Sequence, residues 1–407
     1  MRILFSSYAY PNPWQPGLGT FNRTMLAGLA QQHAVRVIAP VAFTERWRKS
    51  GIADFQALPN VPAEYPTYYY PPKLGRSHYD KFLWWSTRST VRARLREFAP
   101  DVVLSYWAHP DGAVAVRAAH EAGIPAIVMV GGSDVLLLAR SGSRRQAILK
   151  TLAEADAVIA VSQHLQDTLI RDGLPAETIS VIGRGVDTSV FHPGDRVAAR
   201  QELGVPQDRP VIVGVGRLVA VKDWITWLEA CEQLVARGLN PASYVCGAGP
   251  LAAELRHWID QRGLTDFIEL RGSQSPQQLA TWYRAADLTL LTSLSEGIPN
   301  VLLESMACGG SFVATAVGGI PEITDPIYDR LAPAKNATAI AEAIVDRLHH
   351  TPPTGYQRRF EPSSQTTTTQ RLTELLNRVC GHRTNHTVRT ENSDAIPCAF
   401  EDAAIRC

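Results

Sequence analysis

Short apolar runs of strand length alternate with amphipathic segments of helix length along most of this 407-residue chain. Repeated strand–helix alternation is typical of parallel β-sheets that carry helices on both faces. The pattern runs from Arg2 to Val161, breaks off, and resumes after Asp187. We therefore predict an α/β protein with two doubly wound parallel sheets, each in its own domain. Ligands of such sheets bind at the carboxyl ends of the strands, so we expect a cleft between the domains to hold the site.

The apolar runs predict strands at Arg2–Ser7, Val35–Pro40, Asp101–Tyr106, Ala126–Val130, Ala157–Val161, Pro210–Val215, Ala242–Cys246, Phe267–Arg271, Leu288–Thr292 and Phe312–Thr315. The amphipathic segments predict helices at Thr20–Gln31, Tyr79–Phe98, Asp111–Ala122, Arg144–Glu154, Trp224–Ala236, Leu251–Arg262, Pro276–Ala285, Pro299–Cys308 and Asn336–His349. These elements predict an N-terminal domain over 1–185 and a C-terminal domain over 186–350. The boundary is expected in Gly183–Pro206, where no periodicity is visible. A hinge and a crossover helix are expected over 351–380, followed by a flexible tail over 381–407.

The composition is that of a globular protein, with 45% hydrophobic and 19% charged residues and a net charge of +1. It excludes a disordered chain and a disulfide scaffold. No apolar run approaches the ~20 residues of a membrane span, and the first residues do not have the pattern of a signal peptide. The six cysteines show no CxxC spacing. We expect a soluble cytoplasmic protein.

The net charge conceals an asymmetry, because residues 1–185 carry six excess positive charges and residues 186–407 five excess negative ones. A basic N-terminal domain suits an anionic substrate, or peripheral contact with the inner face of an anionic membrane. The predicted helix Tyr79–Phe98 carries Trp84 and Trp85, followed by four arginines, which suits a membrane surface. The favoured alternative is an ordinary amphipathic helix with its Trp face in the core. Nucleic acid is not an expected partner.

Two loops at the predicted cleft are suited to bind an anion. In Pro16-Gly17-Leu18-Gly19-Thr20, the glycines allow a close backbone approach and a helix N-terminus follows, although such a loop is more often a simple turn. No complete G-x-G-x-x-G is present, which disfavours a nicotinamide dinucleotide fold. After the strand Pro210–Val215, Gly216-Arg217-Leu218 and Lys222 offer two cations that suit a diphosphate. The alternative is a pair of solvated surface charges.

The most informative stretch is Glu296-Gly297-Ile298-Pro299-Asn300-Val301, which continues through Glu304 to Gly309. Pro299 suits the first position of a helix, so the N–H groups of Asn300 and Val301 would point at an anion. Glu296 in the loop and Glu304, eight positions later, offer carboxylates that accept hydrogen bonds from sugar hydroxyls.

This E-x7-E spacing, with G-R-L-x3-K at Gly216–Lys222 and with Gly318-Gly319-Ile320-Pro321-Glu322, resembles the retaining glycosyltransferases of family 4. That family has the GT-B fold, two Rossmann-like doubly wound parallel-sheet domains with a cleft between them. The stretches Ser105–Gly112 and Gly131-Gly132-Ser133-Asp134 are similar to members that build bacterial surface polysaccharides, such as the teichuronic acid biosynthesis glycosyltransferases. The resemblance covers roughly residues 1–350.

The resemblance implies that Arg217 and Lys222 hold the diphosphate of a nucleotide-sugar donor and offset its charge as it leaves. It implies that Glu296 binds hydroxyls of the donor sugar and that Glu304 binds the ribose. The remaining donor-binding positions implied are Gly17, Gly19, Gly216, Gly297, Ile298, Pro299, Asn300 and Val301.

On the other side of the cleft, the resemblance implies that His109 is the family's active-site histidine, near the reacting carbon of the sugar. A capping or core histidine is the alternative for His109. Trp107 and Asp134 belong to the stretches that the resemblance places on the acceptor side.

As a whole, the resemblance implies a retaining hexosyltransferase that moves a hexose from a nucleotide-diphosphate sugar to a glycan or lipid-linked glycan acceptor in surface polysaccharide biosynthesis. No cofactor or metal is expected, because the chain has no D-x-D and cationic side chains would supply the electrostatics. Ala248 replaces the acid of the usual G-D-G-P, and Ser311 stands where the family has proline. The alternatives are a catalytically idle nucleotide-sugar-binding scaffold and a GT-B nucleotide-sugar epimerase or hydrolase.

Overall fold

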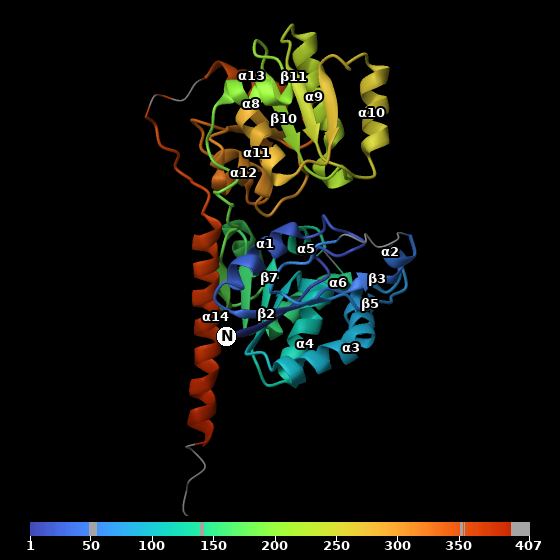
Figure 1. Ribbon diagram of the computed structural model, residues 1–407, viewed down its shortest axis with the longest axis vertical. Coiled ribbons are helices and arrows are strands. Elements are labelled where there is room, and N and C mark those ends of the chain that lie inside the picture. The colour runs from blue at the N-terminus through green and yellow to red at the C-terminus, as the bar shows by residue number, and fades with distance from the viewer. Residues whose placement is uncertain (49–54, 139–141, 351–352, 354, 392–407) are drawn as a thin grey trace, which may run out of the picture.

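The computed structural model describes residues 1–48, 55–138, 142–350, 353 and 355–391, with side chains to residue 381. It has two lobes, one above the other in Figure 1, and a long helix runs along the side of the N-terminal lobe. Each lobe has a fully parallel sheet with helices on both faces. The predicted α/β class and the two doubly wound domains are therefore confirmed.

The N-terminal sheet has seven strands in the order β4-β2-β1-β6-β7-β8-β9. Their bounds are β1 Arg2–Ser6, β2 Ala34–Ile38, β4 Ala63–Glu64, β6 Val102–Tyr106, β7 Ala126–Val130, β8 Ala157–Ala160 and β9 Ile179–Val181, and a separate two-stranded sheet pairs β3 (Val41–Ala42) with β5 (Thr67–Tyr68). The chain order reverses between β1 and β6, whose register pairs Ile3 with Val102 and Ser6 with Ser105. Doubly wound sheets bind ligands at the carboxyl edge of this switch point.

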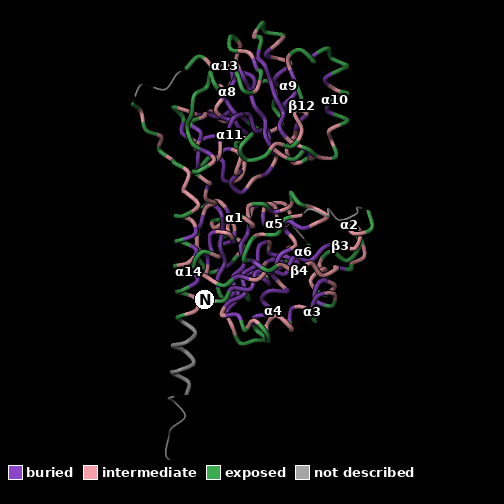
Figure 2. Tube along the Cα trace, viewed as in Figure 1, coloured by how far each residue is buried: buried purple, intermediate pink, exposed green. Residues whose placement is uncertain are grey.

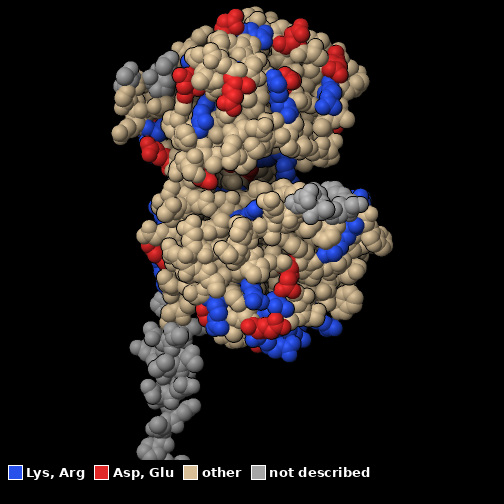
Figure 3. Space-filling view, in the orientation of Figure 1, with Lys and Arg blue, Asp and Glu red and all other residues tan. Residues whose placement is uncertain are grey.

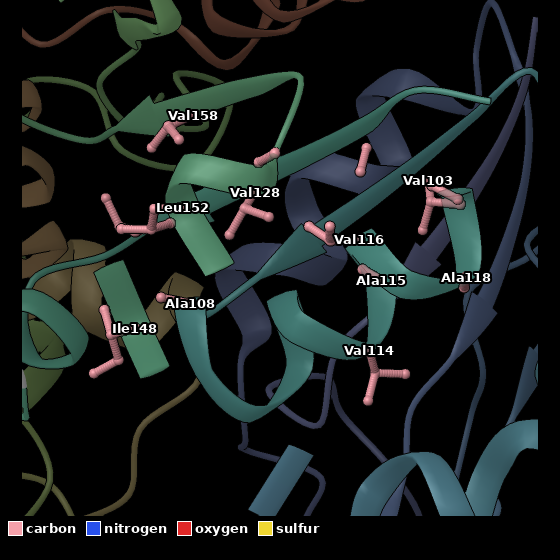
Figure 4. Close-up of a cluster of buried hydrophobic side chains, with 14 of the residues drawn as sticks. Val103, Ala108, Val114, Ala115, Val116, Ala118, Val128, Ile148, Leu152 and Val158 are labelled. Atoms are coloured by element: carbon pink, nitrogen blue, oxygen red, sulfur yellow. The ribbon is translucent and has the colours of Figure 1, made fainter. Parts of the chain in front are cut away.

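The helical elements of this domain are α1 Thr20–Leu29, α2 Phe43–Arg48, η1 Arg76–His78, α3 Tyr79–Phe98, η2 Ala108–Gly112, α4 Ala113–Glu121, α5 Ser133–Leu136, α6 Gly142–Glu154, α7 Gln163–Arg171 and η3 Ala176–Thr178. One sheet face packs on α3, α4, α6 and α7, and the other packs on α1. Figure 4 shows Ile148 and Leu152 of α6 in the same apolar cluster as Ala108 of η2 and Val128 of β7. The cluster fixes η2 and the second half of α6 against the sheet.

The C-terminal sheet has the order β12-β11-β10-β13-β14-β15, with a switch point between β10 and β13. The strands are β10 Val211–Val215, β11 Ala242–Cys246, β12 Ile268–Gly272, β13 Leu288–Leu291, β14 Phe312–Thr315 and β15 Arg330–Ala332. The helical elements are α8 Arg196–Leu203, η4 Ala220–Lys222, α9 Trp224–Ala236, α10 Ala252–Gln261, α11 Pro276–Ala285, α12 Asn300–Ala307, η5 Ile320–Ile323 and α13 Ala337–His349.

Buried residues run through the centre of both lobes (Figure 2). In β10, Val211, Val213 and Val215 pack toward α11 and α12, whereas Ile212 packs toward α9 and α13. Successive side chains of a strand point to opposite faces. A strand buried on both faces therefore appears in the sequence as a continuous apolar run, which is why these strands were predictable.

The chain passes between the domains at two neighbouring places. Val186 forms a parallel bridge with Ser364, and the N–H of Gln365 donates to the carbonyl of Val186 at 2.9 Å. Helix α14 (Gln365–Glu391) then returns to the N-terminal domain beside α1. Leu372, Leu375 and Leu376 are buried there with the core of that domain.

Two expectations from the sequence need correction. The stretch Gly183–Pro206 is not free of regular structure, because α8 occupies Arg196–Leu203, with the Asp195 carboxylate accepting from the N–H of Ala198 at its N-terminus. Residues 381–391 were expected in the tail, without periodicity, but they continue helix α14. The rest of the expected tail, 392–407, lies outside the described residues. Among the described helices, none is long and apolar enough to cross a membrane.

Candidate active site

Lys222 and Glu296 form an ion pair at the carboxyl edge of the C-terminal sheet. Lys222 ends η4, after β10, and Glu296 lies in the loop after β13, on the other side of the switch point. The Lys222 ammonium donates to Oε1 of Glu296 at 2.5 Å, and the Ser293 hydroxyl donates to the same oxygen at 2.6 Å. Both charged side chains are largely buried, with 17% and 13% of their area exposed. The structure thus brings together two of the four charged residues that the sequence predicted for the donor, the others being Arg217 and Glu304.

The loop that carries Glu296 is held by close backbone contacts. The N–H of Gly319 donates to the carbonyl of Gly297 at 2.9 Å, and the N–H of Leu294 donates to the carbonyl of Val221 at 2.8 Å. A Cβ on Gly318 would lie 1.8 Å from the carbonyl oxygen of Glu296, so a side chain does not fit there. Gly318 and Gly319 therefore allow the backbone of the 318–322 motif to pack directly against the Glu296 loop.

Arg217 lies on the exposed surface of the turn after β10. Its guanidinium has no hydrogen-bond or ion-pair partner recorded in the described part of the chain, whereas its carbonyl accepts from the indole N–H of Trp224 at 2.9 Å. The turn packs on the loop Gly247–Gly249, where a Cβ on Gly247 would lie 1.8 Å from the carbonyl of Gly216. A fixed turn with a free guanidinium suits a bidentate anion such as a diphosphate.

Glu304 lies on α12, one turn from its end, and accepts from the phenol of Tyr283 on α11 at 3.0 Å. Burial raises the pKa of Glu304 from 4.5 to about 7, and the hydrogen bond from Tyr283 opposes the increase only in part. The first residue of α12 is Asn300, so Pro299 precedes the helix rather than beginning it. The N–H groups of Leu302 and Leu303 donate back to the Pro299 carbonyl, while no backbone partner is recorded for the N–H of Asn300 or Val301.

The two domains touch through backbone at the Glu296 loop. A Cβ on Gly297 would lie 2.3 Å from the carbonyl oxygen of Gly131, and one on Gly132 would lie 2.6 Å from the amide nitrogen of Gly297. Gly132 has φ +128°, which side chains rarely adopt. Only glycine at these positions permits so close an approach. The predicted donor loop is therefore directly opposite the predicted Gly131-Gly132-Ser133-Asp134 stretch.

Arg184 bridges the domains beside this contact. Its guanidinium donates to the Asn300 side-chain oxygen at 3.2 Å and to the Tyr106 hydroxyl at 2.5 Å, and it lies over the Phe21 ring at 3.9 Å from the centroid. Burial raises the pKa of Tyr106 to about 12, although Arg184 opposes the increase. Sequence reasoning predicted only Asn300 of this group.

Glu322 makes a second bridge. Gln163 and His164 are the first two residues of α7, and their N–H groups donate to the Glu322 carboxylate at 2.8 and 2.6 Å. The Ser162 hydroxyl accepts from the N–H of Leu165, so three of the four unpaired N–H groups at this helix end are satisfied. A carboxylate of one domain thus caps a helix of the other.

His109 lies in η2, three residues beyond the end of β6, and is only 1% exposed. Its Nε2 is 3.3 Å from Oδ1 of Asp80 on α3. Burial alone would raise the pKa of Asp80, but the hydrogen bond and charge of His109 outweigh it and hold that pKa below its usual value. The last residue of β6 is Tyr106, so a tyrosine rather than His109 occupies the strand end at the domain contact.

Asp134 is fully buried and holds two loops in place. Its carboxylate accepts from the N–H groups of Ala108, Gly131 and Gly132 at 3.3, 3.1 and 2.9 Å. Burial raises its pKa above the usual value, and these hydrogen bonds limit the increase. Trp107 is half-buried, at φ +88°, and its ring meets the Tyr8 ring edge-on at 6.1 Å. The geometry gives Asp134 a positioning role and places the half-buried Trp107 against Tyr8 at the switch point.

Gly17 and Gly19, the two glycines of the loop before α1, differ in how closely other atoms approach them. A Cβ on Gly19, which has φ +65°, would lie 2.0 Å from the carbonyl of Ala9, so its conformation is required by the loop itself. Gly17 is exposed and has nothing within 4 Å, which leaves room for a ligand. Among the described residues, no group of three or more His, Cys, Asp or Glu side chains is placed to hold a metal ion.

Two family models match the chain. The model "Glycosyltransferase Family 4" matches residues 17–190, and the model "Glycosyl transferases group 1" matches residues 195–363. The boundary between them falls at the crossing between the two sheets. The fold, the site and these matches define the protein as a GT-B glycosyltransferase, a transferase enzyme with two Rossmann-like domains. Within that class, the N-terminal domain matches the family 4 glycosyltransferases and the C-terminal domain matches the group 1 glycosyl transferases.

Relatives and solved structures agree with this assignment. TuaC of Bacillus subtilis, named as a teichuronic acid biosynthesis glycosyltransferase, is 28% identical over 86% of this chain and 90% of its own. The D-inositol 3-phosphate glycosyltransferase of Mycolicibacterium smegmatis is 32% identical over 70% of this chain and 61% of its own. The crystal structure of Anabaena HepE in complex with UDP and glucose shares the fold, with TM-score 0.67 and 20% identity over 97% of this chain and all of that one.

Proposed function

We propose that this protein is a retaining glycosyltransferase that moves a hexose from a nucleotide-diphosphate sugar to a glycan or lipid-linked glycan in surface polysaccharide biosynthesis. The observation that carries the proposal is the Lys222–Glu296 pair beside the free Arg217 guanidinium, at the carboxyl edge of the C-terminal sheet. Cations suit the donor diphosphate, and a carboxylate in the same place suits the hydroxyls of the attached sugar.

In this proposal, Arg217 and Lys222 bind the diphosphate and stabilise the negative charge that grows on it as the glycosidic bond breaks. Glu296 accepts from a sugar hydroxyl, and Glu304 accepts from the ribose. Backbone from Gly297 to Val301 supports the sugar and the phosphates. Because the leaving phosphate takes the proton of the acceptor on the same face of the sugar, the anomeric configuration is retained. No metal or other cofactor has a role in these steps.

The acceptor is held by the N-terminal domain. Trp107 and Tyr8 lie at the carboxyl ends of β6 and β1, which form the switch point of that sheet. His109, held by Asp80, lies behind them in η2 and is the nearest match to the family's active-site histidine. Figure 3 shows basic side chains on both sides of the gap between the lobes, as an anionic donor requires.

The similar proteins HepE and TuaC indicate which donor and which product to test first. HepE, which shares the fold, binds UDP and glucose, so a UDP-sugar is the first donor to test. TuaC is named for teichuronic acid biosynthesis, which supports a surface polysaccharide as the product. We place the reaction in the cytoplasm, where nucleotide sugars are made.

Peripheral contact with an anionic membrane through the basic N-terminal domain is part of this proposal. Trp84 is 6% exposed and belongs to the core, but Trp85 on the same helix is 62% exposed. Basic side chains gather at the end of this lobe remote from the cleft (Figure 3), the end where helix α3 lies in Figure 1. Binding to phosphatidylglycerol vesicles, and its loss in Trp85→Ser, would support the contact, whereas equal binding to neutral vesicles would contradict it.

The test of the proposed function is transfer followed by analysis of the product. The protein is incubated with UDP-, GDP- and ADP-sugars and a lipid-linked oligosaccharide extract, and the anomeric configuration of the new linkage is read by NMR. A product with the donor's configuration supports the proposal. An inverted linkage contradicts retention, an isomerised or hydrolysed donor indicates the epimerase or hydrolase, and donor binding without any conversion indicates the idle scaffold.

A further inference from the structure

Arg184, at the first chain crossing between the domains, is a cation that the proposed donor site does not use. Its guanidinium donates to the side-chain oxygen of Asn300 at 3.2 Å and to the hydroxyl of Tyr106. It also lies over the ring of Phe21, 3.9 Å from the centroid. Asn300 begins α12 in the C-terminal domain, whereas Tyr106 ends β6 and Phe21 lies on α1 in the N-terminal domain. A single side chain therefore contacts both sides of the cleft.

The backbone that carries Arg184 is held by the second chain crossing. The N–H of Val186 donates to the carbonyl of Ser363 at 2.9 Å. A Cβ on Gly185 would lie 2.6 Å from the Cα of Gln365, so the two crossings are in direct backbone contact. Because this contact fixes where the Arg184 side chain begins, the length of that side chain limits how far the start of α12 and the N-terminal domain can separate while both remain bound to it.

The N-terminal side of this contact is closely packed. A Cβ on Gly131 would lie 1.7 Å from the hydroxyl oxygen of Tyr106 and 3.2 Å from Nη2 of Arg184. The carbonyl of Gly131 is also the group that Gly297 approaches from the other domain. The contact of Arg184 with Asn300 thus lies beside the backbone contact between the domains, and Gly131 takes part in both.

The groups that Arg184 contacts are neutral. Asn300 and Tyr106 offer uncharged oxygens, and the rings of Phe21 and Tyr106 offer cation–π attraction. No carboxylate is recorded within ion-pair distance of the Arg184 guanidinium among the described residues, so the protein itself leaves this charge without a counter-ion. A cation of this kind adds a positive potential to the cleft.

The charge of Arg184 lies at the positive end of α12. The peptide dipoles of a helix leave partial positive charge on its first N–H groups, and the N–H groups of Asn300 and Val301 have no backbone partner recorded in the described chain. A guanidinium at the same place is unfavourable until an anion binds. In the proposed function that anion is the diphosphate of the donor, so donor binding and the contact of Arg184 with Asn300 should reinforce each other.

We propose that Arg184 is a positioning residue, which holds the start of α12 against the N-terminal domain so that a bound donor faces the acceptor side of the cleft. Its effect on transfer rests on the proposed function, whereas the tie between the domains does not. The groups that bind the donor directly lie in the C-terminal domain, so Arg184 acts through Asn300 and Tyr106. A displacement of ~1 Å between reacting groups can reduce a rate by about 10²-fold, so a looser contact would affect the rate of transfer more than donor binding.

The kinetic test compares wild type with Arg184→Lys and Arg184→Gln. Arg184→Lys keeps the charge but not the planar fork that contacts two groups at once. We expect it to lower kcat at least tenfold, while the Kd of the donor, measured by calorimetric titration, stays within threefold of wild type. Arg184→Gln should lose as much in kcat and, without the charge, should bind the donor severalfold more weakly.

Arg171→Gln is the matched control for these variants. Arg171 lies at an exposed position of α7, where its guanidinium contacts only the Thr168 hydroxyl of the same helix. This variant should keep the kcat and the donor Kd of wild type. Wild-type kcat in Arg184→Lys, or a loss of donor affinity alone in both Arg184 variants, would overturn the proposal.

A structural measurement separates this inference from the proposed function. If no acceptor is glycosylated with any donor, the proposed function fails, but hydrogen–deuterium exchange still tests the tie between the domains. In Arg184→Gln and in Asn300→Ala, each shown to be folded by circular dichroism, the backbone amides of 131–135 and 296–303 should exchange at least threefold faster than in wild type and Arg171→Gln. The double variant should exchange no faster than either single one, because both changes remove the same contact. Unchanged exchange in Arg184→Gln, or additive increases in the double variant, would overturn the proposal.

Discussion

The ammonium of Lys222 and the carboxylate of Glu296, 74 residues apart in the sequence, lie 2.5 Å apart across the switch point of the C-terminal sheet. With Ser293 on the same carboxylate oxygen, the pair is held in place without any ligand. The cation and the acceptor groups that a nucleotide sugar needs are thus preorganised, and a donor would replace water rather than reorganise side chains.

Replacing Lys222 tests this pair directly. We expect Lys222→Ala to reduce kcat by on the order of 10²-fold, because one stabilising charge on the leaving diphosphate is lost. Because the variant leaves the largely buried Glu296 carboxylate without its cation, a lower melting temperature is expected, and turnover is measured at a temperature where the variant is folded. Lys150→Ala, on the exposed side of α6, is the matched control, with 74% of the Lys150 side chain exposed. Unchanged turnover in Lys222→Ala would remove the diphosphate assignment.

The raised pKa of Glu304 predicts that the stability of the folded protein depends on pH. Its pKa is raised by burial from 4.5 to about 7, so the folded state favours the neutral carboxyl. The stability it contributes is complete below pH 4.5 and is lost as the pH rises to about 7. Glu304→Gln should therefore gain a few degrees in melting temperature relative to wild type between pH 5 and pH 8. Parallel pH profiles for the two proteins would contradict the raised pKa.

The same carboxyl predicts a pH dependence of donor binding. Ribose hydroxyls donate more strongly to an ionised carboxylate, so a bound nucleotide sugar should favour ionised Glu304. We expect affinity to increase severalfold from pH 6 to pH 8 in calorimetric titrations, and Glu304→Gln to lose this increase. Because the diphosphate of a nucleotide sugar does not titrate in this range, equal slopes for both proteins would mean that Glu304 does not contact the donor.

The variant Gly297→Ala tests how strongly catalysis depends on the contact between the two domains. A methyl group on Gly297 would lie 2.3 Å from the carbonyl oxygen of Gly131, so Gly297→Ala must separate the domains locally. Transfer should fall at least tenfold, and small-angle scattering should show a larger radius of gyration. Gly183→Ala is the control, because its new methyl would meet only the carbonyl of Val161, at 3.8 Å. Equal activity of the two variants would contradict a closed working state.

His109 and Asp80 are expected to act as one unit in transfer. His109→Gln should reduce transfer more than tenfold and leave nucleotide binding intact, since the residue lies in the N-terminal domain. Asp80→Asn, which removes the charge opposite His109, should produce a similar loss, and the double variant should be no worse than either single one. Loss of nucleotide binding in His109→Gln, or additive effects in the double variant, would contradict this assignment.

Local sequence patterns predicted the elements that are buried on both faces. Helix α9 and strand β14 match the expected ranges residue for residue, because their apolar periodicity is strong. Helix α8 escaped prediction because its core side includes the charged Arg200, whose burial depends on an ion pair with Asp287 at 2.6 Å. That partner is 87 residues away, so no local pattern reveals it.

The meeting of the loops after β10 and β13 was also predictable, since residues that follow neighbouring parallel strands must meet at one sheet edge. The cross-domain contacts were not. Arg184 with Asn300, and Glu322 at the start of α7, depend on how the two domains meet, which no spacing within either domain encodes. The role of Tyr106 at the end of β6 was not predictable either, because its partner Arg184 lies 78 residues away in the sequence.

A metal-free thermal-shift titration of wild type, Arg217→Ala and Lys222→Ala with UDP, GDP, ADP and their sugar conjugates tests the donor site directly. A ligand that binds only the folded state raises the melting temperature, and the increase continues to grow at concentrations above its Kd. We expect one nucleotide series to stabilise wild type by several degrees and both variants to lose most of that shift. No stabilisation by any series, or an equal shift in all three proteins, would contradict a donor site at Arg217, Lys222 and Glu296.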